Sequence, residues 1–518
     1  MIISLNNKKI DDIQSLLNQE GDQKIFDLNI NLKNVEFVQK NGISLLFSHL
    51  SGFQDLKKLT LKLEQQQINE DTVGSLAEVI QQITKLKEIS FEFNDAKIST
   101  SEFNCLFSSI GLHPSINSFY FQINQNILSH VECLAITKCL EQSNSLKCFK
   151  FQLFHFNHGH YGNFEYNEYI PYSQQSTQLN QDSCLQVRLH NFRFSQDCGF
   201  SLLIQHLHQI ENLKKIELIL GDLQINKSDF GSLSLSIKQA KQLKEIVFDF
   251  YRVKTSATQL DDLFSFFRDH TCIQSLTFYY SYVNLGGDEL YSITQSLKQS
   301  QSLRILKLKL KLDSTKLEKQ ANHMFSQQLS QLENIRSLNY TVLFDNISFV
   351  EEIVKNKYLQ ELDLTFCHLD EDTNYQEWAQ KLLGMSNLKK LRLDFYSSNS
   401  DIKEIEFFKD LNDNIKQTNL QQLTISLNNH HEDLTGQYII LGKYLSSQRL
   451  IYDLSLEVHE NDEFESCEML MDQLKNSHIF SFKFNFSNWN RRWFTERLDK
   501  LHLIVKKHMK RVVKLEFC

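Results

Sequence analysis

The sequence predicts an α/β fold, a curved solenoid with a parallel sheet on its concave face and helices on its convex face, built from about 17 repeats of about 30 residues. An eight-residue pattern with apolar residues at positions 1, 4, 6 and 8 returns along the chain at a nearly constant spacing. An apolar stripe of helical period follows many copies of it. With only 15 glycines and 2 prolines in 518 residues, little of the chain is available for interdomain linkers.

The strand pattern is clearest in "LKKLTLKL", "LKEISFEF", "INSFYFQI" and "LKCFKFQL", which start 30 residues apart at Leu56, Leu86, Ile116 and Leu146. Positions 4, 6 and 8 alternate with polar residues, which indicates a strand with one buried face. The pattern begins with a degenerate copy at Ile25, so we expect an N-terminal cap at 1–24 and the solenoid at 25–518. The later copies start at Leu213, Leu243, Ile273, Leu303, Ile335, Leu359, Leu388, Leu420, Ile451 and Ile479, and the chain closes on a strand from Val512.

The segments between strands change to a helical period. In "DTVGSLAEVIQQI" the apolar residues recur at i, i+3, i+4 and i+7, which predicts an amphipathic helix with Asp71 or Thr72 as its N-cap. The segments "SDFGSLSLSIKQA" from Ser228 and "DELYSITQSLKQ" from Asp288 repeat this scheme. Neither apolar face can be buried within one repeat, so the repeats must stack.

The L-x-x-L-x-L core followed by a helix resembles the leucine-rich repeat superfamily, near its ribonuclease-inhibitor-like subclass. The resemblance covers about residues 20–518 and implies a horseshoe-shaped solenoid. The divergent, Phe-rich and Gln-rich copies are similar to those of ciliated protists. The Asn or Cys that the family places just after the third Leu is mostly replaced by Phe, Leu, Ile or Val, so the sequence does not predict the family's asparagine ladder.

Composition limits the classes of function. Hydrophobic residues make up 41% and charged residues 23%, which is typical of a folded protein, and the net charge of −8 argues against a dedicated nucleic-acid binder. We find neither a secretory signal nor a long apolar span, so we expect a cytoplasmic protein that does not bind membranes. The ten scattered cysteines form no C-x-x-C pair and are interpreted as reduced core thiols.

Strand positions 3, 5 and 7 point away from the helices and are the candidate binding positions. They form acidic bands near Asp249 and near Glu361 with Asp363, and basic bands near Lys307 with Lys309 and near Lys390 with Arg392. Tyr279 adds an aromatic side chain to this face. Two interpretations stay open: a merely solvated face, or a protein-binding surface whose charge bands set the register of the partner. We favour the second because repeat arrays generally bind through this face.

Residues 154–183 are expected to form an irregular loop, because no helical period runs between the repeat starts at Leu146 and Cys184, which are 38 residues apart. We interpret the loop as a contact loop with Tyr161, Tyr166 and Tyr169 as aromatic anchors. A metal site is the alternative, but the spacing of His155, His158 and His160 matches no standard zinc site, and no metal is predicted.

The C-terminal segment "WNRRWFTERLDKLHLIVKKHMKRVV" predicts a helix with an apolar side and a basic side. It is either the polar cap of the last repeat or a basic patch for an acidic partner such as tubulin tails, nucleic acid or anionic lipid. The candidate anchors in this segment are Trp489, Arg491, Arg492 and Trp493.

These observations predict a non-catalytic scaffold that binds one or more proteins through the concave face and loops, in a ciliary or cytoskeletal assembly by analogy. The sequence contains no motif for a phosphate, nucleotide or catalytic metal, so no cofactor or small-molecule substrate is expected. The resemblance implies one catalytic alternative, a GTPase activator using Arg188, Arg252 or Arg392. The other alternative is a substrate adaptor of a ubiquitin ligase, which the short segment before the first repeat disfavours.

Overall fold

In the computed structural model the chain forms two compact units, residues 1–274 and 275–518. The part of the chain that it describes contains no helix long and apolar enough to cross a membrane. The described residues are 2–6, 9–10, 25–33, 35–37, 42–64, 70–94, 98–124, 127–143, 145–154, 184–190, 193–194, 201, 203–204, 213–223, 225–312, 316–342, 346–366, 375–395, 419–427, 453–458, 469–470, 472–474, 479, 481–486, 503 and 514–517.

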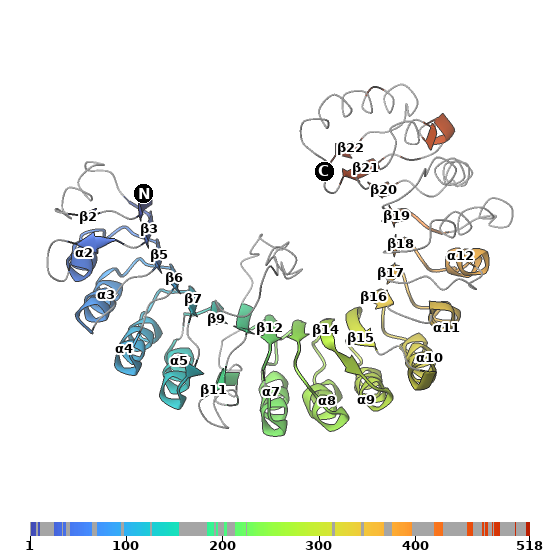
Figure 1. The fold of residues 1–518 in the computed structure, drawn as a ribbon, viewed down its shortest axis with the longest axis horizontal. Coiled ribbons are helices and arrows are strands. Elements are labelled where there is room, and N and C mark those ends of the chain that lie inside the picture. Colours follow the sequence, from blue (N-terminus) through green and yellow to red (C-terminus); the bar gives the residue numbers. More distant parts are fainter. Residues whose placement is uncertain are drawn as a thin grey trace. The chain divides into compact units, whose positions relative to one another are not determined.

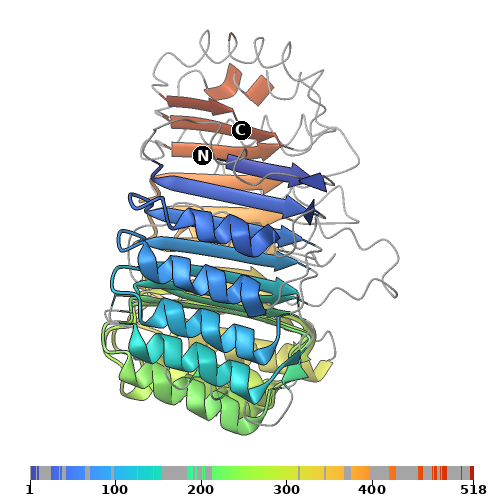
Figure 2. The same cartoon turned by 90° about the vertical axis from the view of Figure 1, so that its left-hand side faces the viewer.

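The first unit is a parallel sheet covered by helices on one side (Figure 1). Each strand pairs with the next in the order β1 (Ile2–Asn6), β3 (Asp27–Lys33), β5 (Lys58–Glu64), β6 (Glu88–Asn94), β7 (Ser118–Asn124), β9 (Cys148–Phe154), β10 (Cys184–His190), β12 (Lys215–Gly221) and β13 (Glu245–Tyr251). The helices are α2 (Gly42–Leu50), α3 (Glu70–Gln82), α4 (Thr100–Gly111), α5 (His130–Gln142), α7 (Lys227–Gln239) and α8 (Ala257–Phe264), followed by the 3₁₀ helix η4 (Ser265–Arg268). Figure 2 shows strands β3 to β7 stacked in one layer, with α2 to α5 in a second.

Two short parallel pairs accompany this sheet. One joins β2 (Lys9–Ile10) to β4 (Glu36–Phe37), and the other joins β8 (Ile127–Leu128) to β11 (Arg193–Phe194).

The second unit repeats the arrangement, with parallel strands paired in chain order and helices on one side (Figure 1). Its helices are α9 (Gly287–Lys298), α10 (Lys316–Ser330), α11 (Asn346–Ile353) and α12 (Tyr375–Leu383). Its strands are β14 (Ser275–Leu285), β15 (Ile305–Leu312), β16 (Ser337–Val342), β17 (Glu361–Phe366), β18 (Lys390–Phe395), β19 (Gln422–Leu427), β20 (Asp453–Val458), β21 (Ser481–Phe486) and β22 (Lys514–Phe517). The predicted α/β class, with a parallel sheet alternating with helices, is therefore confirmed.

The periodicities predict most of these elements correctly. In β5, Leu59, Leu61 and Leu63 are buried, while Thr60 and Lys62 between them are partly exposed. Helices α3, α7 and α9 lie where the helical stripes predicted them. The expected cap residues of α3 are wrong, because Asp71 and Thr72 lie inside its first turn.

Phenylalanine fills much of the core between sheet and helices in the first unit. Phe107 of α4 lies with its ring centroid 5.1 Å from that of Phe121 on β7, in an edge-to-face arrangement. Phe121 in turn stacks on Phe151 of β9 at 5.8 Å, so aromatic contacts run from repeat to repeat. These side chains are fully buried, so the abundance of Phe in this part of the chain serves packing.

The turns before the strands carry a polar ladder that the sequence did not predict. In the first unit, a ring nitrogen of His113 lies 3.2 Å from the carbonyl oxygen of Ile83, and His270 makes the same contact with Ala240 at 2.9 Å. Burial lowers the pKa of both imidazoles, although the carbonyl hydrogen bonds oppose that shift. Asparagines fill this role in the second unit, where Asn334, Asn356, Asn387 and Asn419 donate to carbonyl oxygens of the preceding repeat.

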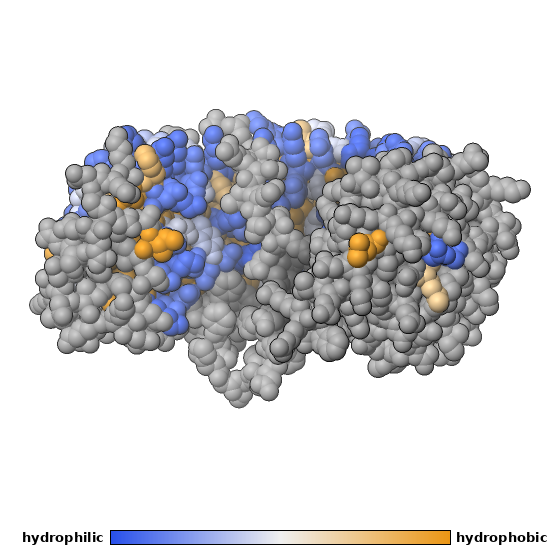
Figure 3. Space-filling model, turned by 90° about the horizontal axis from the view of Figure 1, so that it is seen from above, coloured by the Kyte–Doolittle hydropathy of each residue, from blue (hydrophilic) through white to orange (hydrophobic). Residues whose placement is uncertain are grey.

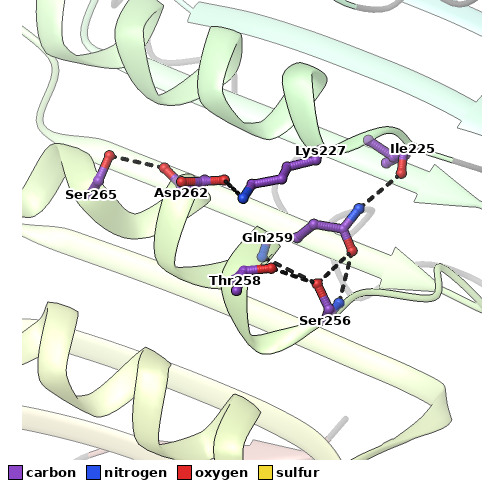
Figure 4. A network of polar contacts seen from close by, with 7 residues as sticks. All are labelled: Ile225, Lys227, Ser256, Thr258, Gln259, Asp262 and Ser265. Carbon is purple, nitrogen blue, oxygen red and sulfur yellow. Dashed lines mark hydrogen bonds and ion pairs between the residues drawn. The ribbon is translucent and has the colours of Figure 1, made fainter.

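Capping residues also connect successive repeats (Figure 4). At the N-terminus of α8 the backbone N–H of Ser256 donates to Oε1 of Gln259 at 2.8 Å, and Ser256 Oγ accepts from the backbone N–H of Gln259 at 3.4 Å. The amide of Gln259 donates to the carbonyl of Ile225 in the repeat before, at 3.2 Å. This capping box therefore fixes both the start of α8 and its position against the neighbouring repeat.

Candidate functional site

The candidate site is the sheet face that points away from the helices. Figure 3 shows that most described residues visible from this side are hydrophilic, with a few hydrophobic ones among them. Because the strands pair in register, corresponding side chains form rows across the face. In the first unit, the row at the strand starts contains Glu88, Ser118, Cys148, Cys184, Lys215 and Glu245.

Strands β3, β5 and β6 carry ion pairs between neighbouring strands, which we call the charged ladder. The pairs are Lys33–Glu64, Lys58–Glu88 and Lys62–Glu92, with N···O distances of 2.5, 3.0 and 2.7 Å. Their side chains are between 20% and 50% exposed. The charges on this part of the face thus neutralise one another while staying in contact with solvent.

Four polar side chains on the same face of β10, β12 and β13 are largely buried, and we call Gln186, Arg188, Glu217 and Asp249 the buried polar cluster. Glu217 Oε1 accepts a hydrogen bond of 2.5 Å from Gln186 Nε2 and lies 3.6 Å from an Arg188 guanidinium nitrogen. Glu217 and Asp249 are only 5% and 7% exposed. Asp249 therefore lies on the predicted face, but its side chain is buried instead of presented to solvent.

Tyr120 on β7 lies beside this cluster on the same face. Its hydroxyl donates to Oε1 of Gln122 at 2.5 Å and lies 3.1 Å from Oε1 of Gln152 on β9. Burial raises the pKa of Tyr120, and the nearby Glu92 carboxylate adds to that shift. The phenol therefore stays protonated and acts as a hydrogen-bond donor.

In the second unit, the predicted acidic and basic bands of β17 and β18 pair with each other, and we call Glu361, Asp363, Lys390 and Arg392 the charged quartet. Lys390 Nζ lies 2.7 Å from Glu361 Oε1, and Arg392 Nε lies 3.8 Å from Asp363 Oδ1. The hydrogen bond from Lys390 lowers the pKa of Glu361. Burial raises the pKa of Asp363 to about 6, although Arg392 and the amide of Asn339 oppose that shift.

Strands β14 and β15 hold the remaining predicted residues of this face. Tyr279 and Lys309 are aligned in register and partly buried, whereas Lys307 is exposed. Ile305, on the same strand, is 37% exposed. The Lys307 ammonium makes no hydrogen bond or ion pair with any described residue.

The other predicted contact residues lie outside the described residues. These are Tyr161, Tyr166 and Tyr169 in the expected loop at 154–183, and Trp489, Arg491, Arg492 and Trp493 near the C-terminus. The strands that flank the loop show that the predicted repeat start at Cys184 is wrong. Cys184 aligns with Cys148, the third position of its repeat, so corresponding positions are 36 residues apart and not 38.

Sequence reasoning missed two sets of residues on this face. The thiols of Cys148 and Cys184 lie side by side, which the wrong repeat start concealed. Gln186 and Glu217 lie at polar positions of their strands, and nothing in their local sequence signals burial. Within the described part of the chain, three or more metal-binding side chains do not cluster anywhere.

Comparison with known proteins does not identify a family for this chain. No protein-family model matches the sequence, and no curated protein matches it.

Proposed function

We propose that the chain is a leucine-rich repeat solenoid of the ribonuclease-inhibitor-like subclass, with about 17 repeats, that acts as a non-catalytic protein-binding scaffold. Support for the repeat class comes from parallel strands that alternate with helices on one side in each unit. Among the described residues no helix covers the opposite sheet face, and polar side chains line it. By analogy with the divergent repeats noted above, we propose a cytoplasmic, ciliary or cytoskeletal assembly as its location.

The charged quartet is the observation that carries this proposal. Its members are between 32% and 52% exposed, so each ion pair contributes little to folding stability and is cheap to rearrange. A partner with carboxylates and ammonium groups at matching spacing replaces these pairs by intermolecular ones. Acidic β17 and basic β18 lie next to each other, so the partner is held in one register and charge-mismatched proteins are rejected.

Lys307 and Ile305 extend this surface along β15. The exposed ammonium and the exposed aliphatic side chain lie on the same strand face, two residues apart. Asp363 lies two strands further on in the row of Lys307, with Asn339 between them. We therefore propose that the partner contacts both Lys307 and the charged quartet, which lie in the second unit.

The arginines considered for GTPase activation support a non-catalytic function. Each one is engaged with a carboxylate of the chain itself. Arg252 lies 3.7 Å from Asp222, and its guanidinium is 5.0 Å from the ring centroid of Tyr251. Arg188 is largely buried beside Glu217. To act on a bound nucleotide, Arg188 has to leave this pair, at a cost in desolvation and lost pairing.

The test is quantitative capture of partners with charge variants of the full chain. The reversal K390E/R392E is expected to lower the amount of captured partner at least about tenfold, because like charges then oppose each other across the interface. The swap E361K/K390E keeps the internal ion pair but exchanges its charges, and it is expected to weaken capture as well. The matched control is K298E on α9, an exposed lysine on the helical side, which leaves capture unchanged.

Two outcomes contradict the proposal. One is undiminished capture by both quartet variants, given folded protein by circular dichroism. The other is loss of capture in K298E alone.

A further inference from the structure

Cys148 and Cys184 form a thiol pair on the helix-free face of the first unit. They are the first residues of the adjacent parallel strands β9 and β10, and they align directly in the sheet register. Their Sγ atoms are 2.7 Å apart, and both side chains are partly exposed. The pair belongs to neither the charged ladder nor the charged quartet.

The backbone geometry suits a covalent bond between these two sulfurs. Neighbouring strands in a sheet lie about 4.7–4.9 Å apart. Directly aligned residues therefore have Cα atoms within the range of about 4.4–6.8 Å that disulfides span. The two side chains already lie on the same face with their sulfurs in contact, which favours a bond between them.

The two thiols differ in acidity. The two thiols share a hydrogen bond in which either sulfur can donate, and the interaction with Cys148 lowers the pKa of Cys184, although burial opposes the shift. The ammonium groups of Lys150 and Lys215 lower it further. The same hydrogen bond, together with burial, raises the pKa of Cys148. Cys184 is thus the more acidic thiol and the better nucleophile of the two, and Cys148 is the neighbour that can resolve an oxidised Cys184.

The other described cysteines lack this combination. Cys133 and Cys139 are completely buried in the core, and burial raises the pKa of Cys139 to about 12. Cys105 and Cys272 are exposed. These two residues are therefore the reference thiols for the experiment below, because they are exposed and no other described cysteine is paired with them.

We propose that Cys148 and Cys184 form a reversible disulfide site that hydroperoxides oxidise. The Cys184 thiolate attacks one oxygen of hydrogen peroxide, the O–O bond breaks, and the departing hydroxide takes a proton to become water. The product is the sulfenic acid of Cys184. The sulfur of Cys148 then attacks that of Cys184, the S–S bond forms, and the S–O bond breaks. The thiol proton of Cys148 leaves with the hydroxide as a second water, so that two thiols and one peroxide give one disulfide and two waters.

Oxidation changes the face in two ways. It removes a thiolate beside Lys150 and Lys215, so that the local charge becomes more positive. It also ties β9 to β10 covalently, across the 36 residues that separate the two cysteines along the chain. A dithiol reductant reverses both changes by thiol–disulfide exchange. The site is independent of the proposed partner-binding function, because its chemistry requires only the two thiols and their neighbours.

The experiment uses the full chain, reduced and then treated with hydrogen peroxide at stoichiometric and at tenfold excess. Remaining thiols are alkylated, and the digest is analysed by mass spectrometry without reduction. The expected product is a peptide that links Cys148 to Cys184 and disappears after treatment with dithiothreitol. In the untreated protein at pH 7, Cys184 is expected to react with iodoacetamide at least about tenfold faster than Cys272.

Variants separate the roles of the two thiols. C148S is expected to stop at the sulfenic acid of Cys184, which dimedone traps, and C184S is expected to form no link. The control variant C105S/C272S should give the same linked peptide as the wild type. If the soluble wild-type protein at tenfold peroxide links Cys148 or Cys184 only to other cysteines, or gives no linked peptide at all, the proposal is overturned. That result needs no variant and does not bear on the charged quartet.

Discussion

The charged ladder and the buried polar cluster lie on the same face of the same sheet, yet they are opposite kinds of surface. Lys62 and Glu92 form an ion pair that is open to solvent. Arg188 and Glu217 form one that is almost completely buried. Both pairs join neighbouring parallel strands in the first unit. The difference shows that strand alternation determines which face a side chain lies on, whereas its burial depends on what covers that face.

The two regions should respond very differently to the same substitution. A buried carboxylate that neutralises a buried guanidinium cannot be replaced by water, so its removal leaves a charge in a poorly solvated site. An exposed pair loses only a weak, screened attraction.

The largest effect is expected for Glu217→Ala, which leaves Arg188 and the amide of Gln186 without their carboxylate. We expect the free energy of unfolding to fall by about 3–5 kcal/mol. Urea denaturation followed by circular dichroism measures it. A loss below about 1 kcal/mol would show that the cluster is as well solvated as the ladder.

Oxidation of Cys148 and Cys184 is expected to have the next largest effect. Cys184 lies on β10, a strand of the buried polar cluster, and Cys148 lies on the adjacent strand β9. A disulfide there stabilises the folded chain by about 2–4 kcal/mol relative to the reduced one, mainly by restricting the unfolded chain. Thermal unfolding with and without dithiothreitol measures this difference. Equal midpoints in a sample whose disulfide is verified by mass spectrometry would contradict the expectation.

Acidification is expected to weaken the turns next to both regions through His113 and His270. Burial lowers the pKa of both side chains below their unfolded value of 6.5, so the folded state binds the proton less tightly. Their contribution to stability is complete above pH 6.5 and is lost as the pH falls below it. The urea midpoint should therefore drop between pH 7 and pH 5.

The matched variant is H113N/H270N, because asparagine already donates to the same kind of carbonyl at Asn356. It is expected to flatten this pH dependence while retaining the hydrogen bonds. An unchanged slope in this variant would assign the acid sensitivity to other groups.

A smaller effect is expected within the charged quartet. Its two carboxylates, the more buried Asp363 and the more exposed Glu361, have pKa values shifted in opposite directions. Asp363 should titrate near pH 6, whereas Glu361, paired with Lys390, should titrate below its usual value. Because the folded pKa of Asp363 is raised, its contribution to stability is greatest below about pH 4 and declines as the pH rises to about 6. Side-chain carboxyl chemical shifts measure both groups. A normal aspartate pKa at Asp363 would show that it is fully solvated.

The smallest effect is expected in the charged ladder itself. Lys62→Ala should change the free energy of unfolding by less than about 1 kcal/mol, and the change should shrink further in 0.5 M salt. This variant is the matched control for Glu217→Ala. A loss comparable to that of Glu217→Ala would remove the distinction between the two regions.

The fold was largely predictable because strand and helix periods repeat over many copies. Leu59, Leu61 and Leu63 fall at the alternating positions and are all buried. The charged ladder also had a signal, since Lys58 and Glu88 occupy the same position in consecutive repeats with opposite charge. The pairing within the quartet follows the same rule.

Other features depend on contacts that no local pattern encodes. Glu217 and Glu92 are both acidic residues on polar strand positions, yet only Glu217 is deeply buried. The thiol pair required the register between β9 and β10, which the irregular spacing obscured. Strand β1 was missed because five residues are too few to establish a period. The histidine contacts in the turns connect atoms 30 residues apart, and only the stacking of repeats brings these together.

Site-specific photo-crosslinking tests the central claim most directly, that a protein partner binds the helix-free sheet face. A photoreactive phenylalanine analogue would replace Lys307 on β15 or, as the control, Lys298 on the helical side. The account predicts a discrete cross-linked protein from the Lys307 position and none from Lys298. Cross-linking from Lys298 alone, or from neither position in cells that make the protein, would contradict it.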